Sequence, residues 1–168
     1  MTKNPAKQLA LGAVFIALET LLGSVFSLQF LLTKISFSFV LMIIAGYFFS
    51  PFMAGLLSGV SYTLGMLLFP KFPFFLGFSF SAFLAGVLFA YCLQKAATWW
   101  SIIGVNFLVT FGIYLGFNSW WLHLLYGTSW SVLLTTRTPQ EVVTFGIYVL
   151  VTTMVLKIPT WSRLAQKV

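Results

Sequence analysis

Few side chains in this 168-residue chain could take part in covalent chemistry. The chain contains two acidic residues, Glu19 and Glu141, one histidine, His123, and one cysteine, Cys92. So small a set cannot supply the usual ligands of a metal cluster, and a single cysteine cannot form an internal disulfide. The sequence also lacks the GxxxxGK[ST] loop that cradles nucleotide phosphates. We therefore expect no metal and no cofactor, and binding is favoured over catalysis.

One nucleophile and base pair is conceivable, formed by Ser58 and His123. We expect these two residues toward opposite membrane faces, which disfavours a hydrolase. Glu19 lies well inside an apolar segment. An acid at such depth is either functional or hydrogen-bonded to a hydroxyl group of the same bundle, and both interpretations stay open. Glu141 follows Thr138 at the spacing of a capping box, so we interpret it as a helix cap.

Three basic residues stand apart from the other cations. Lys34, Lys71 and Arg137 each fall in a different predicted loop on one side of the membrane. Three cations that converge on one face suit an anionic ligand. The alternative is that each one caps a helix C-terminus or reaches lipid headgroups.

Aromatic and amide side chains accumulate in the same half of the predicted bundle. The aromatic residues near these loops are Phe37, Phe39, Phe72, Phe74, Phe75, Phe78, Trp120, Trp121, Tyr126 and Trp130. An interfacial aromatic belt explains some of them. Flat rings also bury a planar ligand, and the amides of Asn106 and Asn118 match the edge of a heterocycle. Together with the cations, these residues indicate a site for a planar ligand with a carboxylate tail.

The composition requires that membrane helices position these residues. Hydrophobic residues make up 60% of the chain and charged residues 7%, whereas a soluble domain carries roughly 25% charged residues. A helix needs about 20 residues to cross the bilayer. We predict an all-α integral membrane protein, a single six-helix domain over residues 1–168. The predicted helices span residues 6–28, 37–49, 52–69, 76–93, 99–122 and 138–158.

The basic residues predict the orientation of this bundle. The cations on the side of the two termini are Lys3, Lys7, Lys95, Lys157, Arg163 and Lys167. Because lysine and arginine concentrate in cytoplasmic loops, we expect both termini in the cytoplasm and the chain in the plasma membrane. The net charge is +7, but no basic run is long enough for a nucleic-acid module.

Small residues predict where helices pack. In the first helix they recur in steps of four and three, at Ala6, Ala10, Ala13, Ala17, Thr20, Ser24 and Ser27. Such a stripe lets another helix approach closely, and that helix could belong to this chain or to a partner. Gly55 and Gly59 form a GxxxG pair, for which packing inside the bundle is favoured. The aromatic segment 69–78, FPKFPFFLGF, is predicted to cap the ligand site.

Three stretches resemble the substrate-binding S components of energy-coupling-factor (ECF) vitamin importers, and the folate-specific branch most of all. Residues 13–17, AVFIA, resemble the AxxxA motif of the first helix. Residues 68–79 resemble an LFP…FFPGFT stretch, and residues 118–127, followed by Arg137, resemble an NTLWLSLLYG…R segment. The resemblance extends over nearly the whole chain.

The sequence also departs from that branch at three places. Leu76 stands where the branch usually has proline, and Tyr62 stands where an aspartate is common. Lys34 begins KISFSF in the place of a RIGFSF-like start to the second helix.

The resemblance implies an S component that captures folate outside the cell and hands it inward with a transmembrane coupling subunit and two cytoplasmic ATPase subunits. It implies that Ala10, Ala13 and Ala17 contact the coupling subunit. The ligand-binding residues that we expect are Lys34, Phe37, Phe39, Lys71, Phe74, Phe78, Ser79, Asn106, Asn118, Trp121, Tyr126 and Arg137. The alternatives are an S component for another vitamin or precursor (pyrimidine, thiamin or riboflavin), or a stand-alone secondary carrier that uses Glu19.

Overall fold

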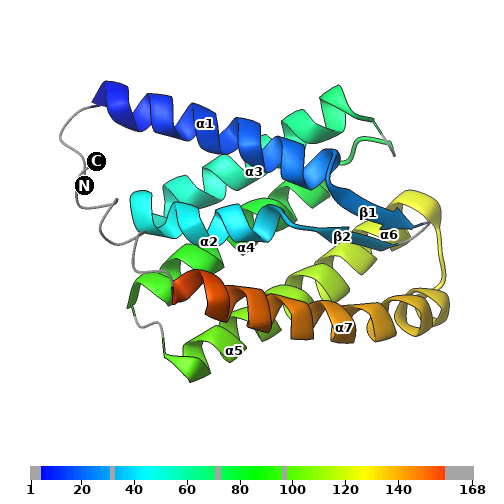
Figure 1. Cartoon of the computed structure of the whole chain (residues 1–168). Coiled ribbons are helices and arrows are strands. Elements are labelled where there is room, and N and C mark those ends of the chain that lie inside the picture. The colour runs from blue at the N-terminus through cyan, green and yellow to red at the C-terminus, as the bar shows by residue number, and fades with distance from the viewer. Residues whose placement is uncertain (1–4, 31–32, 71–72, 96–97, 158–168) are drawn as a thin grey trace.

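The computed structural model describes residues 5–30, 33–70, 73–95 and 98–157. Its elements are α1 (Pro5–Ser24), β1 (Ser27–Phe30), β2 (Thr33–Ser36), α2 (Ser38–Phe48), α3 (Pro51–Leu68), α4 (Leu76–Lys95), α5 (Trp99–Phe107), η1 (Leu108–Phe117), α6 (Asn118–Tyr126) and α7 (Trp130–Leu156). The start of α1 and the end of α7 lie at one end of the bundle, and the two strands and α6 lie at the other (Figure 1).

Five helical segments are long and apolar enough to cross a bilayer. They are Ala6–Ser24, Pro51–Leu68, Leu76–Gln94, Trp99–Tyr126 and Trp130–Leu156. The remaining helix, α2, has 11 residues, which makes it about 17 Å long against a hydrocarbon core of about 30 Å. The chain is therefore a multi-pass membrane protein. Helix α2 coincides with the predicted helix 37–49 but is too short to cross the bilayer by itself.

The two strands are an addition to the predicted all-α fold. They form an antiparallel hairpin in which Ser27 pairs with Ser36 and Phe30 with Thr33, where the sequence indicated only a polar break. Each strand has four residues, which is too short for an alternating pattern to stand out. The hydroxyl group of Tyr148 in α7 donates to the Ser36 carbonyl at 3.2 Å, so the hairpin is tied to the opposite side of the bundle.

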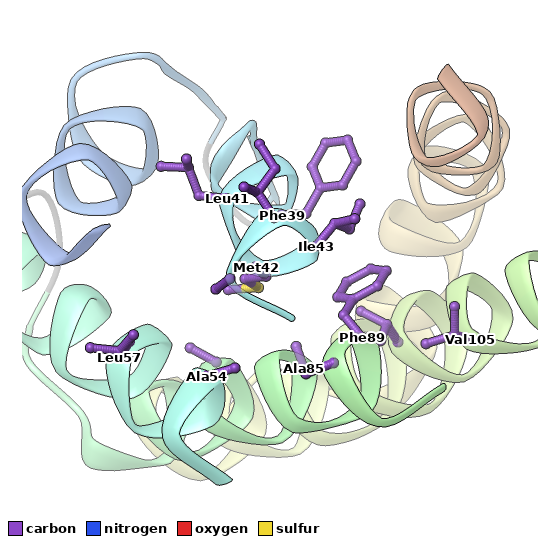
Figure 2. Packing of buried hydrophobic residues seen from close by; sticks show 14 of the residues in the cluster. Phe39, Leu41, Met42, Ile43, Ala54, Leu57, Ala85, Phe89 and Val105 are labelled. Carbon is purple, nitrogen blue, oxygen red and sulfur yellow. The ribbon is translucent and has the colours of Figure 1, made fainter. Parts of the chain in front are cut away.

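The short helix α2 is the centre of the hydrophobic core. Its side chains are buried around most of the helix, and Phe39, Ile43 and Ala45 are each about 1% exposed. Figure 2 shows Met42 on the side of α2 that faces α3 and α4, whereas Leu41 points toward α1. A helix that is apolar on all sides needs neighbours on all sides, and the bundle supplies them.

Glycine allows α3 and α4 to approach each other closely. A Cβ atom at Gly55 would lie 2.8 Å from the Phe83 carbonyl oxygen, and one at Gly59 would lie 3.3 Å from the Phe83 Cβ. From the other helix, a Cβ atom at Gly86 would lie 3.0 Å from the Ala54 carbonyl oxygen. The GxxxG pair therefore packs inside the bundle, as predicted.

The predicted helix 99–122 continues to Tyr126 and contains a ten-residue π-helix, η1. Segments of π-helix are uncommon and often occur at functional sites. The helical run ends at Gly127, whose φ of 64° is the left-handed conformation that glycine adopts most readily.

The predicted start of the last helix is wrong. Helix α7 begins at Trp130 after the N-cap Ser129, and Pro139 lies in its interior. Proline lacks the N–H group for one helical hydrogen bond, but membrane helices tolerate it where neighbouring groups satisfy the freed backbone. The Thr138–Pro139 pattern therefore marks no helix start here, and Glu141 is not a cap. Arg137 lies in a buried part of α7, not in a loop.

Candidate functional site

A partly open cavity of about 140 Å³ lies between the helices, in the half of the bundle that holds the hairpin. The cavity is lined by residues of α1 to α4, of strand β2, and of η1, α6 and α7. Its acidic, basic, amide and phenolic lining residues are Glu19, Tyr62, Tyr114, Asn118, Tyr126, Arg137, Glu141 and Tyr148. An apolar cavity of about 150 Å³ can hold a benzene molecule, so this one has room for a ring system.

An ion pair lies on the α7 side of the cavity. Arg137 Nη2 lies 3.4 Å from Glu141 Oε1, one helical turn away, and both side chains are buried. Arg137 Nη2 also donates to the Tyr114 carbonyl of η1 at 2.9 Å. Arg137 Nε and Glu141 Oε2 have no hydrogen-bond partner among the described residues. The pair thus keeps one donor and one acceptor that a bound ligand could use.

Glu19 of α1 lies in the cavity wall formed by α1 and α3. It is 3% exposed, and neither carboxylate oxygen meets hydrogen-bond geometry with another described residue. The hydroxyl groups of Ser58 and Ser61 lie beside it. The adjacent Thr20 donates to the Ser61 carbonyl at 3.1 Å, which fixes this part of α1 against α3. Sequence reasoning left open whether Glu19 is functional, and its place in the cavity favours that interpretation.

Tyrosine rings form much of the remaining lining. Tyr148 stacks on Phe39 with ring centres 3.8 Å apart and planes 17° apart, and it meets the Tyr114 ring nearly edge-on at 6.2 Å. Tyr62 lies 6.4 Å from the Phe78 ring. The contacts hold these rings in place before any ligand arrives, which suits recognition of a flat molecule.

Four of the residues predicted from sequence line the cavity. They are Phe78, Asn118, Tyr126 and Arg137. The Oδ1 atom of Asn118 is buried and has no hydrogen-bond partner among the described residues. These four come from α4, α6 and α7, so the fold brings together segments that are distant in sequence.

Two further predicted residues act on the cavity only through a neighbour. Phe39 lies behind Tyr148 and stacks on it. Trp121 Nε1 donates to the Ser81 hydroxyl at 3.1 Å, and Ser81 lines the cavity. Both residues therefore position lining groups.

The structure does not bring four other predicted residues to the cavity lining. Asn106 is buried but donates to the Ile102 carbonyl and to Thr152. Ser79 bonds with Thr63 at 2.8 Å in a separate groove between α3 and α4. The Phe37 and Phe74 side chains are 40% and 43% exposed.

The side chains of the two remaining predicted ligand-binding residues, Lys34 and Lys71, cannot be placed relative to the cavity. Lys34 belongs to strand β2, but its side chain lies outside the described part of the structure. Lys71 lies outside the described residues.

Sequence reasoning missed Glu141 and Tyr148 as lining residues. Both belong to a buried polar stripe on α7, spaced by four, three, four and four residues, that comprises Arg137, Glu141, Thr144, Tyr148 and Thr152. This spacing places all of them on one helix face. The stripe is visible only when residues 130–156 are treated as one helix.

The small-residue stripe of α1 divides into two parts. Ala10, Ala13 and Ala17 are exposed, whereas Thr20 and Ser24 are buried within the bundle. The alanine face is thus not covered by the described part of this chain.

Ser58 and His123 do not form a nucleophile and base pair. The Nδ1 atom of His123 lies 2.7 Å from the Thr128 carbonyl oxygen, and its ring packs on Trp130. Ser58 instead lines the cavity.

Comparisons with known proteins agree with this architecture. Residues 7–156 match the family model described as the ECF transporter, substrate-specific component. The folate transporter FolT of Clostridium novyi (strain NT) is 32% identical over 141 residues, which cover 83% of this chain and 81% of the relative. FolT of Leuconostoc mesenteroides subsp. mesenteroides is 25% identical over 173 residues, which cover 99% and 93%.

A solved structure shares the fold as well. The crystal structure of FolT bound with folic acid has 36% sequence identity to this chain and a TM-score of 0.83, over 88% of this chain and 90% of that one. The family resemblance predicted from the motifs is confirmed, and this chain belongs to the family of substrate-specific components of ECF transporters.

Proposed function

We propose that this chain binds folate at the extracellular side of the plasma membrane, as the substrate-binding subunit of an ECF-type vitamin importer. The observation that carries the proposal is the cavity between the helices, which unpaired acid, guanidinium and amide atoms line together with tyrosine rings. Folate joins a planar pterin ring to a benzoyl group and a glutamate tail. Two relatives named folate transporters and a related structure bound with folic acid support this choice of ligand.

The size of the cavity supports a particular orientation of the ligand. A volume of about 140 Å³ accommodates a ring system but not the whole of folate. We infer that the pterin ring enters the cavity and that the glutamate tail points toward the end of the bundle that holds the hairpin and Tyr126. Lys34 belongs to strand β2 and Lys71 follows α3 in the sequence, and we propose that their charges attract the tail carboxylates.

Transport requires partners that this chain does not contain. The sequence has no phosphate-binding GxxxxGK[ST] loop, so we propose that two cytoplasmic ATPase subunits and a transmembrane coupling subunit supply the energy. The exposed alanine face of α1 (Ala10, Ala13 and Ala17) is our candidate contact for the coupling subunit. Small residues permit the close helix approach that such a contact needs within lipid.

Calorimetry on the purified chain tests the ligand. We expect folate to bind far more tightly than riboflavin, thiamin or biotin, because only folate combines a donor-rich bicyclic ring with a dicarboxylate tail. A weaker or equal affinity for folate would contradict the proposed specificity. Tight binding of one of the other vitamins would identify an S component for that vitamin.

A further inference from the structure

Glu19 is the acid in the cavity that has no ion-pair partner among the described residues. Among the described residues the single ion pair joins Arg137 and Glu141. Both oxygens of Glu19 fall short of hydrogen-bond geometry with the neighbouring Ser58 and Ser61 hydroxyl groups, and only 3% of the residue is exposed. A buried polar group without a partner is unfavourable, and within a membrane bundle such a group usually marks a functional contact.

The surroundings of Glu19 fix its position. Thr20 bonds to the Ser61 carbonyl at 3.1 Å, so the α1 backbone next to Glu19 is held against α3. The Ser61 hydroxyl is itself occupied, because it donates to the Leu57 carbonyl at 2.6 Å. On the far side of Ser58, Gly86 allows α4 to pack tightly against α3. The carboxylate is therefore presented to the cavity by a rigid wall and not by a loop.

We propose that Glu19 determines specificity by accepting two parallel N–H hydrogen bonds from the heterocycle of the ligand. This inference rests on the proposed function. In folate, the ring N3–H and the 2-amino group lie side by side on one edge of the pterin. The two oxygens of a carboxylate match such a pair of donors, and hydrogen bonds to a charged acceptor are the strong ones.

The position of Glu19 explains why the pterin ring of folate would enter the cavity before the glutamate tail. Among the lining residues, Glu19 and Ser58 are buried, as is the Oδ1 atom of Asn118, whereas Tyr126 is 46% exposed. A ligand whose donor edge reaches Glu19 must have its tail directed outward past Tyr126. A ring without the donor pair would leave the carboxylate unpaired, and sites built on buried hydrogen bonds reject such ligands strongly.

A comparison of two ligands on two proteins tests this inference. The ligands are folate and a folate analogue in which hydrogen replaces the 2-amino group, and calorimetry gives their dissociation constants for the wild type and for Glu19→Gln. We expect the wild type to prefer folate by about 10- to 100-fold, the effect of one lost hydrogen bond to a charged group. In Glu19→Gln the preference should fall to within about threefold, because the amide offers a single acceptor oxygen.

A control and a conservative variant keep the test decisive. Thr152→Val removes a buried hydroxyl group that bonds to Asn106 outside the cavity, so it should lower stability and leave the ligand preference unchanged. If Glu19→Gln cannot be purified, the shorter carboxylate of Glu19→Asp must reduce the preference while keeping measurable binding.

Two outcomes would separate the inference from the function on which it rests. An equal loss of affinity for both ligands in the Glu19 variants, or no preference in the wild type, would overturn the role of Glu19 while folate binding stands. Failure of the wild type to bind folate more tightly than riboflavin would instead overturn the proposed function.

Discussion

Asn106 and Asn118 carry the same amide on one helical run, but their surroundings give them different tasks. Asn118 lines the cavity, and its buried Oδ1 atom has no partner among the described residues. Asn106 lies about three turns away, where its Nδ2 atom donates to the Ile102 carbonyl at 2.8 Å and to Thr152 at 3.2 Å. The first amide is available to a ligand and the second is used by the fold.

Alanine at each position should separate these tasks. Asn118→Ala should weaken folate binding by about tenfold and change the melting temperature little, because a ligand hydrogen bond is lost but no internal one. Asn106→Ala should leave affinity unchanged and lower the free energy of unfolding by about 1–3 kcal/mol, because it strands the Thr152 hydroxyl. Calorimetry and thermal unfolding of both variants check this, and an equal effect of the two on affinity would contradict it.

The sequence supports part of this residue-level picture. Asn106, Thr110, Tyr114 and Asn118 are spaced by four residues, which puts them on one helix face, and all four side chains lie on the inner side of the bundle. The sequence cannot reveal that the amide of Asn106 is already paired, because its partner Thr152 lies 46 positions away on another helix.

Helix α1 is buried against this chain at its C-terminal end and exposes a face of small residues at its N-terminal end. Its last turns are buried against α3, where Thr20 bonds to Ser61. Its earlier turns expose the alanine face. In a membrane, a face of small residues allows the backbone of another helix to approach closely, so it favours helix–helix contact. The element thus links the ligand cavity, through Glu19, to a surface suited to a partner.

Bulky residues on the alanine face should block the partner without harming the cavity. The double variant Ala13→Trp and Ala17→Trp should abolish co-purification with the coupling and ATPase subunits and abolish uptake, because the helices could no longer approach. Folate binding should stay within about twofold of the wild type, since both side chains point away from the bundle. Loss of ligand binding in this variant would show that the face packs within the chain.

Leu18→Trp provides the matched control for this variant. Leu18 is 45% exposed and follows Ala17 directly, so its side chain projects about 100° away around the helix. Tryptophan there should leave both assembly and binding intact. A loss of assembly equal to that of the alanine variant would assign the effect to general disturbance of α1.

How well an element can be predicted depends on whether local sequence determines it. The helices 37–49, 52–69 and 76–93 were predicted to within two residues at each end, because proline, serine and polar residues bound their apolar runs. The hairpin and the π-helix η1 were not predicted. Both are stabilised by distant groups, the Tyr148 hydroxyl on Ser36 and the Arg137 guanidinium on the Tyr114 carbonyl.

At the scale of the whole molecule, the two ends of the bundle differ in chemistry. The end where α1 starts and α7 finishes carries Lys7 and Lys157. Three more cations, Lys3, Arg163 and Lys167, flank these helices in the sequence. The opposite end carries the hairpin, the ligand cavity and the turn at Gly127. The excess of basic residues on one side favours its location in the cytoplasm, and we therefore expect the mouth of the cavity on the outside.

Cysteine labelling tests this orientation, because Cys92 is the single cysteine of the chain. In a Cys92→Ser background, cysteine can replace Ser131 at the start of α7 or Trp100 at the start of α5, two exposed positions at opposite ends of the bundle. A membrane-impermeant maleimide should label Ser131→Cys in intact cells and Trp100→Cys only after permeabilisation. The reverse pattern would put the cavity mouth in the cytoplasm, where it could not capture a vitamin from outside, and the proposed direction of transport would then be wrong even if folate binds.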